Sequence, residues 1–134
     1  MSGQALPAAQ RIRRRPEFER IYREGTRIHG RFMTLFVMSN GGSAPRLGVA
    51  ATRKIGTAVE RNRAKRLSRE VFRRHDSIAA IDVVVVPRRE MLDAPFIRIA
   101  ADFDAALTRG RRQLSSTRVS RRGREPRNRR DRTV

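Results

Sequence analysis

Large apolar residues stop recurring after Leu114, and this limit constrains the fold more than any other feature of the sequence. From residue 115 to the C-terminus only Val119 and Val134 are large and apolar, while Arg recurs throughout. A segment with so few apolar side chains cannot bury a core. The core must therefore come from residues 11–114, which are enough for one small domain.

The two ends of the chain are expected to lie outside that domain. Residues 115–134 are predicted to form a disordered Arg-rich tail, and residues 1–10, which are small and lack periodicity, a mobile N-terminal segment. Residues 1–10 also lack the charged start and apolar run of a signal peptide, so we expect a cytoplasmic protein. No apolar run approaches the length that spans a bilayer, so we expect no membrane partner.

The first half of the domain has the pattern of one helix and two strands. Pro16, an apolar stripe that includes Ile21, and Gly25 predict a short first helix. Residues 32–39 are mostly large and apolar and are followed by the turn signal Asn40-Gly41-Gly42-Ser43. Residues 47–52 then resume an extended pattern, and we expect them to pair antiparallel with the first strand.

The second half predicts a helix, a strand and a helix. Thr57 and Glu60 have capping-box spacing ahead of a helix over 58–74. Residues 81–86 are β-branched except for Asp82, which is typical of a buried strand. A third helix is expected from about Pro95, fading near Leu114. The residues expected to face the core from these two helices are Val59, Ala64, Leu67, Val71, Phe96, Ala100, Phe103 and Leu107.

Together these elements predict an α+β fold in a single small domain. A sheet of three or four strands should pack against three helices in the order helix, strand, strand, helix, strand, helix. Strand order does not follow from these patterns.

The charge of the chain restricts its partners. It has 32 Lys and Arg against 13 Asp and Glu, so its formal net charge is +19, and its pI is about 12.0. A compact body with this excess repels itself, which points to a polyanionic partner, with nucleic acid as the first candidate. The sequence contains no Cys, which excludes disulfides and thiol catalysis.

Four cations of the predicted helix over 58–74 form a row. Arg61, Lys65, Arg69 and Arg73 follow one another at i+4 spacing, which lines up side chains along a helix. The alternative is that these cations simply form a solvent-exposed helix face with no ligand. Because that face would suffer like-charge repulsion with few acids to relieve it, phosphate binding is the better interpretation.

Two aromatic residues of the first helix share a face. Phe18 and Tyr22 lie at i and i+4, close in sequence to several cations. Aromatic rings beside cations bind single-stranded RNA by stacking and phosphate contact. The alternative, that both rings belong to the core, is equally weighted for Phe18 and weaker for Tyr22, whose hydroxyl suits a wet edge.

The segment from Gly48 to Arg73 closely resembles the signature of the bacterial ribonuclease P protein subunit. The resemblance is carried, in order, by Gly48, Lys54-Ile55-Gly56, Ala58-Val59, Arg61-Asn62-Arg63, Lys65-Arg66-Leu67, Arg69-Glu70 and Phe72-Arg73. It extends more loosely over residues 11–114. It implies a fold like the second domain of ribosomal protein S5.

The same resemblance implies a division of labour within an endoribonuclease that removes the 5′ leader of precursor tRNA. The RNA subunit would be the catalyst and would require Mg²⁺, while the protein would bind no cofactor. The residues matching the contact with the catalytic RNA are Arg61, Asn62, Arg63, Lys65, Arg66 and Arg69. Those matching the contact with the single-stranded leader are Phe18, Tyr22, Arg53 and Lys54. Leu35 stands where many relatives have an aromatic residue, which leaves one stacking contact open.

Other candidate sites carry less weight. His29 and His75 are far apart and have no Cys companions, so we expect surface residues and no metal site. Asp102 and Asp104 lie on different faces of a predicted helix and are poor candidates for a catalytic pair. Asp82 could cap a turn or bond a nearby Arg. No small-molecule substrate is expected, because Gly48 and Gly56 lack the sequence context of a phosphate-binding loop.

Two other functions compete with the ribonuclease P interpretation. A ribosomal or general RNA-binding protein would also be basic and carry a basic tail. A chromatin-like DNA-binding protein is the weaker alternative, because an aromatic pair suits unstacked strands better than duplex grooves. The signature from Lys54 to Arg69 favours ribonuclease P over both.

Overall fold

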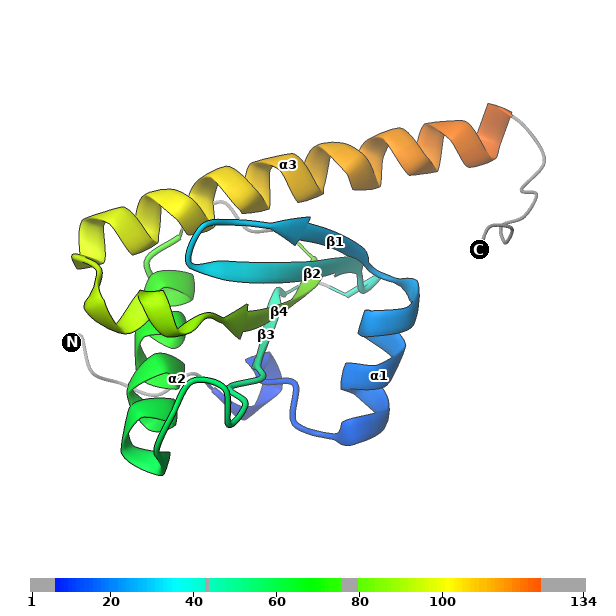
Figure 1. Ribbon diagram of the computed structural model, residues 1–134. Coiled ribbons are helices and arrows are strands. Elements are labelled where there is room, and N and C mark those ends of the chain that lie inside the picture. The colour runs from blue at the N-terminus through cyan, green and yellow to red at the C-terminus, as the bar shows by residue number, and fades with distance from the viewer. Residues whose placement is uncertain (1–6, 43, 76–79, 124–134) are drawn as a thin grey trace.

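The computed structural model describes residues 7–42, 44–75 and 80–123, and of residues 8 and 115–123 only the backbone. These ranges contain three α-helices, four strands and two short 3-10 helices (Figure 1). In chain order they are η1 (Ala8–Gln10), α1 (Arg15–Glu24), β1 (Thr26–His29), β2 (Met33–Ser39), β3 (Arg46–Val49), α2 (Ala58–Arg73), β4 (Ile81–Pro87), η2 (Arg89–Asp93) and α3 (Phe96–Gly123). The predicted α+β class is confirmed.

Strand β4 occupies the interior of the sheet, whose order is β1-β2-β4-β3. It pairs antiparallel with β2 and parallel with β3. The expectation that β3 pairs antiparallel with β2 is therefore wrong. Because β4 is buried, its backbone amides and carbonyls need a paired strand on each edge. The loop after Asn40 carries the chain past the place that β4 takes between β2 and β3.

Strand β1 is an element that the sequence patterns missed. It has four residues, of which only Ile28 is apolar, so it shows no alternation to recognise. The strand pairs with β2 through a tight connection at residues 30–32. Asp102 of α3 holds this connection, because its carboxylate accepts hydrogen bonds from the backbone amides of Arg31 and Phe32 at 2.9 and 2.8 Å.

The helices cover both faces of the sheet. α1 packs on one face, where Ile21 joins Ile12 and Val84 in a small apolar cluster. α2, η2 and α3 cover the other face, where the main core includes Leu35 and Phe103, both almost fully buried. The two layers of helices leave part of the α1 face of the sheet uncovered.

Helix α2 begins with the predicted capping box. The Thr57 hydroxyl accepts from the Glu60 amide at 3.2 Å, and the Glu60 carboxylate accepts from the Thr57 amide at 2.9 Å. Ala64 and Val71 face the core as expected, but Val59 is 77% exposed. The step of five residues from Val59 to Ala64 turns the helix by about 140°, so the two cannot share a face.

Helix α3 is longer than expected and contradicts the prediction that it fades near Leu114. Its backbone is helical to Gly123, so the predicted disordered tail is helical over residues 115–123, while residues 124–134 lie outside the described part. The expectation rested on the loss of apolar residues. A helix can continue without them where neither Gly nor Pro interrupts it, and the next such residue is Gly123.

The predicted N-terminal segment lies partly outside the described residues, which begin at Pro7. Within it, η1 ends at Gln10, whose side-chain amide donates to the carbonyl of Pro45 at 3.4 Å. None of the described helices combines the length and hydropathy that crossing a bilayer requires.

An ion cluster ties α1 to the sheet. Arg46 of β3 donates to both carboxylate oxygens of Asp82 on β4, at 2.9 and 2.8 Å, and to Glu17 of α1 at 3.1 Å. The hydrogen bond to Asp82, followed by that to Glu17, raises the pKa of the Arg46 guanidinium above its usual range. Asp82 is 6% exposed and also accepts from Asn40 at 3.0 Å, so the expected bond from Asp82 to an Arg is confirmed.

Removing the carboxylate of Asp82 should therefore destabilise the domain. Asp82→Ala leaves the Arg46 charge with only Glu17, and we expect a loss of about 2–4 kcal/mol in the free energy of unfolding, measured by urea denaturation. Asp93→Ala is the matched control, since Asp93 is exposed and its side chain forms no hydrogen bond or ion pair with the described residues, so its loss should cost less than about 0.5 kcal/mol. Equal effects of the two substitutions would contradict this role for the cluster.

Candidate nucleic-acid interface

The predicted row of cations lies on α2, and the structure modifies its membership. Arg61 donates from Nη1 to the carbonyl of Gly56 at 2.9 Å, so one end of its guanidinium is fixed to the loop before the helix. Lys65 is half-buried and Arg69 is exposed. Arg73 pairs with Glu70 at 2.6 Å and is thereby partly neutralised.

The outward face of α2 carries further cations and one apolar side chain. Asn62, Arg63 and Arg66 are exposed there, as the sequence predicts for a binding face. Val59 lies four residues before Arg63 and seven before Arg66, so it shares their side of the helix. Sequence reasoning wrongly assigned Val59 to the core, and a single exposed apolar side chain does not by itself mark a binding surface.

Both acids of α2 are engaged in ion pairs within the protein. Glu60 bonds to Thr57 and pairs with Arg89 of η2 at 3.3 Å, and the first of these contacts contributes most to lowering the Glu60 pKa. Glu70 pairs with Arg73 and Arg74, which lower its pKa in that order. Among the described residues, no ion pair joins an acid to Arg63, Lys65, Arg66 or Arg69.

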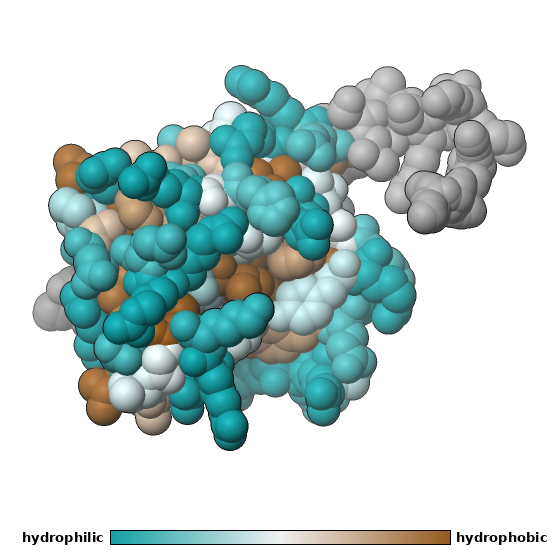
Figure 2. All heavy atoms as spheres, viewed as in Figure 1, coloured by the Kyte–Doolittle hydropathy of each residue, from teal (hydrophilic) through white to brown (hydrophobic). Residues whose placement is uncertain are grey.

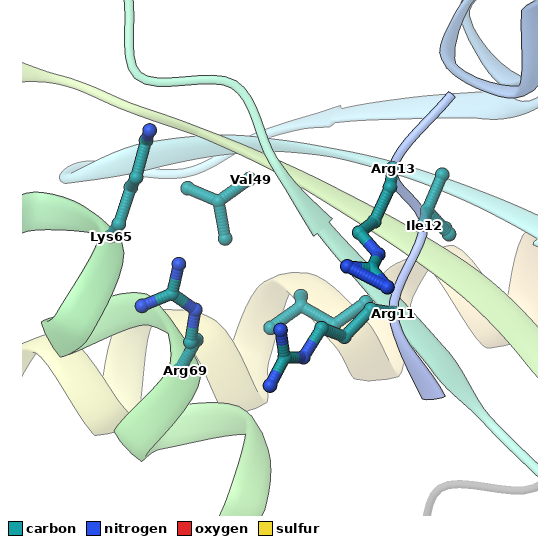
Figure 3. Close-up of a pocket in the computed structure, with 7 residues that line it drawn as sticks. Arg11, Ile12, Arg13, Val49, Lys65 and Arg69 are labelled. Carbon is teal, nitrogen blue, oxygen red and sulfur yellow. The ribbon is translucent and has the colours of Figure 1, made fainter. Parts of the chain in front are cut away.

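A small cationic hollow adjoins α2, with a volume of about 140 Å³. Its cationic lining residues are Arg11 and Arg13 from the N-terminal segment and Lys65 and Arg69 from α2, and its other lining residues are apolar. Figure 3 shows the guanidinium groups of Arg11 and Arg13 on one side of the hollow and that of Arg69 on the other. A concave site lined by several cations and no carboxylate suits a phosphate group.

A larger groove runs along α1, and we call it the α1 groove. It has a volume of about 600 Å³ and lies between α1 and residues 49–52, with Lys65 of α2 at its border. Its lining residues on the α1 side are Arg13, Arg15, Phe18, Glu19 and Tyr22. The space-filling view shows apolar surface gathered near the middle of this face, between hydrophilic side chains (Figure 2). The groove therefore combines rings with cations.

Three aromatic rings form a line beside this groove. The centroids of Phe18 and Tyr22 are 6.2 Å apart, and those of Tyr22 and Phe36 are 4.9 Å apart in an edge-to-face arrangement. Tyr22 is 40% exposed, while Phe18 and Phe36 are half-buried. Burial raises the pKa of the Tyr22 hydroxyl, so this group stays neutral at physiological pH and does not repel a phosphate.

Phe18 has both of the roles that the sequence left open. It packs against the small apolar cluster of the α1 face, and it also lines the groove. A Cβ atom at Gly48 would lie 2.8 Å from the Phe18 ring, so the missing side chain at Gly48 is what lets the ring lie against β3. This close approach explains the need for Gly at position 48, whereas Gly56 is required by its positive φ of 139°.

The expected aromatic contact of β2 comes from the neighbouring residue. Leu35 is fully buried in the main core, so its side chain faces away from α1. Phe36 lies on the opposite face and contacts Tyr22. Period-2 alternation along β2 could have identified Phe36, because Leu35 and Val37 on either side of it both belong to the core face.

The structure separates the other residues predicted to contact a single strand. Arg53 and Lys54 are exposed in the turn after Thr52, next to the groove along the chain but not among its lining residues. Arg13 and Arg15 line it instead and were not predicted. Lys65, assigned by the sequence to the α2 face alone, lines both the groove and the cationic hollow.

The residues given little weight as catalysts have structural contacts. Asp102 holds the connection between β1 and β2, and Asp104 bonds to the His75 ring at 2.9 Å. His29 is exposed, but the side chain of His75 is only 17% exposed and lies against Phe103, so the expectation of a surface residue is wrong for His75. No group of three or more potential metal ligands occurs within the described ranges.

Comparison with known proteins places this architecture in one family. A sequence model of the Ribonuclease P family matches residues 6–111. The chain is 39% identical over 115 residues to the ribonuclease P protein component of Desulfovibrio desulfuricans, a match that covers 81% of this chain and 88% of that relative. It is 34% identical over 111 residues to the ribonuclease P protein component of Syntrophus aciditrophicus, and this match covers 81% of this chain and 93% of that relative.

Solved structures agree with the sequence matches. The RNase P protein from Thermotoga maritima superimposes with a TM-score of 0.67 at 31% identity, over 74% of this chain and 96% of that one. The Staphylococcus aureus RNase P protein gives a TM-score of 0.67 at 33% identity, over 74% and 93%. Matching sequence, helices and mixed four-stranded sheet together establish that the chain belongs to the ribonuclease P protein component family.

Proposed function

We propose that this protein is the subunit of ribonuclease P that binds both the catalytic RNA and the 5′ leader of precursor tRNA, and so assists endonucleolytic removal of the leader. The observation that carries the proposal is the junction of two unlike surfaces at Lys65. On one side lies the cationic face of α2, and on the other the aromatic-lined α1 groove. A folded RNA and a loose strand need these two kinds of surface.

The outward face of α2 is suited to a folded RNA. Its cations line a rigid helix that is fixed at its N-terminus by the capping box, so they are held in register for phosphates. The acids that could neutralise it are engaged with Arg89, Arg73 and Arg74. The residues proposed to contact the catalytic RNA are Arg61, Asn62, Arg63, Lys65, Arg66 and Arg69, with Arg11 and Arg13 completing the cationic hollow.

The α1 groove is suited to a single strand. Rings at Phe18, Tyr22 and Phe36 offer stacking surfaces, which accept any base because every base has a π-face. Arg13, Arg15 and Lys65 supply phosphate contacts along the same groove. Arg53 and Lys54 are proposed to meet the strand where it leaves the groove past Thr52.

We assign the hydrolysis to the RNA subunit and its Mg²⁺ ions. In this division the protein side chains bind and orient the substrate and transfer no proton in the reaction. Proximity alone can contribute several kcal/mol to a rate when it holds the leader in place. The partners are thus the catalytic RNA and precursor tRNA.

The direct test is reconstitution with ribonuclease P RNA. At a magnesium concentration too low for the RNA alone, adding the protein should restore cleavage of precursor tRNA, measured by release of the labelled leader. The protein without RNA should cleave nothing. A protein that binds a ribosomal RNA fragment equally well and leaves precursor cleavage unchanged would instead be a general RNA-binding protein.

Replacing exposed cations of α2 should weaken assembly with the catalytic RNA. The variant Arg63→Gln, Arg66→Gln, Arg69→Gln keeps helix propensity and removes three phosphate contacts. Each phosphate contact on a duplex contributes about 0.9 to the magnitude of the slope of log K against log salt concentration. Losing three contacts should therefore reduce that slope by about 3. Filter binding over a salt series measures both the affinity and the slope.

A matched control removes three charges elsewhere. Arg31, Arg74 and Arg98 are exposed and lie over phenylalanine rings around the start of α3. The variant Arg31→Gln, Arg74→Gln, Arg98→Gln should retain the affinity and slope of the parent protein. Equal losses in both variants would show that net charge, and not the α2 face, determines binding.

Removing the exposed ring of the groove should affect only substrates that carry a leader. Tyr22→Ala eliminates one stacking surface, and because stacking contributes about 1–3 kcal/mol per base, we expect at least about a fivefold loss of affinity for precursor tRNA. Affinity for mature tRNA should not change, as measured by fluorescence anisotropy on the reconstituted enzyme. Phe96→Leu, which alters a ring outside the groove, is the control, and a similar loss for both forms of tRNA would assign Tyr22 a structural role.

A further inference from the structure

The C-terminal part of α3 lies outside the surfaces described so far. Helix α3 continues from Leu114 to Gly123, and we call residues 115–123 the α3 extension. The extension lies beyond the residues that the family model matches, which end at 111. Figure 1 shows the helix running across the sheet and continuing beyond it on the side of α1.

The packing of Gly110 fixes where the helix leaves the body. A Cβ atom at Gly110 would lie 2.9 Å from Val37, and one at Gly25 would lie 2.9 Å from the Val37 carbonyl. Gly25 follows the last residue of α1, so α3 crosses the sheet beside the C-terminal end of α1. From Gly110 to Gly123 the helix rises by about 20 Å, which carries the extension past that end.

The extension is strongly cationic. Arg118, Arg121 and Arg122 occur within it, and no Asp or Glu occurs from residue 105 to residue 123. In the sequence, Arg118 and Arg121 follow Leu114 at i+4 and i+7. Along α3, the large apolar residues that pack on the sheet thus give way to Arg residues in the extension.

The α1 groove leads toward this extension. Its border at Lys65 lies beside α2, while Phe18 and Tyr22 follow α1 toward its C-terminal end. Glu24 is the only acid in the last turn of α1. It forms ion pairs with Arg20 at 3.4 Å and with Arg23 at 3.6 Å. The acid at the C-terminal end of α1 is therefore paired within the helix and is not left free to repel a strand there.

We propose that the α3 extension binds the backbone of the distal, 5′ part of the single-stranded leader after it has passed the α1 groove. This inference rests on the proposed function and adds a second contact on the same strand. The extension and the chain beyond it contain no Phe, Tyr or Trp. The contact would therefore be with phosphates, independent of sequence and sensitive to salt.

The proposal predicts a dependence on leader length. In the reconstituted enzyme, longer leaders should bind more tightly until they reach the extension. In the full chain with Arg118→Gln, Arg121→Gln and Arg122→Gln, this gain should be lost for long leaders, while short-leader precursor and mature tRNA bind as before. Each phosphate contact on a single strand contributes about 0.7 to the magnitude of the slope of log K against log salt concentration. Losing three contacts should therefore reduce the slope for long leaders by about 2.

Three outcomes would overturn the proposal. They are an unchanged affinity for long leaders, an equal loss for every substrate including mature tRNA, and a loss of affinity for the catalytic RNA itself, which would place that RNA on the extension. The variant Arg31→Gln, Arg74→Gln, Arg98→Gln controls for net charge, and circular dichroism checks that Gln keeps the helix. If the parent protein itself showed no dependence on a leader, the proposed function would fail as well.

The absence of Cys from the sequence allows a positional test. A single Cys at Thr117→Cys, between Leu114 and Arg121 on the helix, can carry a photo-crosslinker, and we expect crosslinks to leader nucleotides far from the cleavage site. Ala101→Cys, at an exposed position of α3 over the body, should give none of these crosslinks. Crosslinks from position 117 to the catalytic RNA alone would overturn the assignment.

Discussion

Strand β4 is apolar on both faces, and the rest of the architecture follows from burying it. One face requires α2 and α3, and the other requires α1. Since α1 is a short helix, it covers only part of its face, and the uncovered remainder beside it forms the α1 groove. The same burial places β3 next to β4, which sets the start of α2 at that side of the sheet. The groove and the cationic helix therefore adjoin because of how one strand is buried.

Four acids among the described residues are placed where they hold the fold together. Glu17 and Asp82 surround Arg46, Glu60 closes the capping box, and Asp102 anchors the connection from β1 to β2. Each of these carboxylates is satisfied within the protein and so does not neutralise the outward face of α2. Arg63, Arg66 and Arg69 of α2 consequently make no ion pair within the described part of the protein. A polyanion can bind them without breaking contacts that stabilise the domain.

Local patterns predicted the elements that depend on local physics. The capping box at Thr57, the stop at Gly25 and the buried strand at 81–86 were all identifiable, because each depends on residues a few positions apart. Strand pairing was not, since β3 joins β4 across a helix and β1 has a single apolar residue. The site was predicted where it lies on one helix, as with Phe18 and Tyr22. Arg13 and Arg15 were missed because tertiary packing brings them to the groove, and Phe36 was missed although it contacts Tyr22 beside it.

The direction of α1 links the cationic regions to one another. Its N-terminal end carries Arg15 beside Lys65 and the hollow next to α2, and its C-terminal end lies where α3 leaves the sheet. The aromatic residues between these ends cannot themselves attract a polyanion over a distance, because stacking acts only at contact. Cations at both ends can do so over roughly a Debye length of about 8–10 Å. A strand captured at either end is then held close to the rings, so the order of charge, ring and charge along α1 suits a ligand that is long, flexible and uniformly anionic.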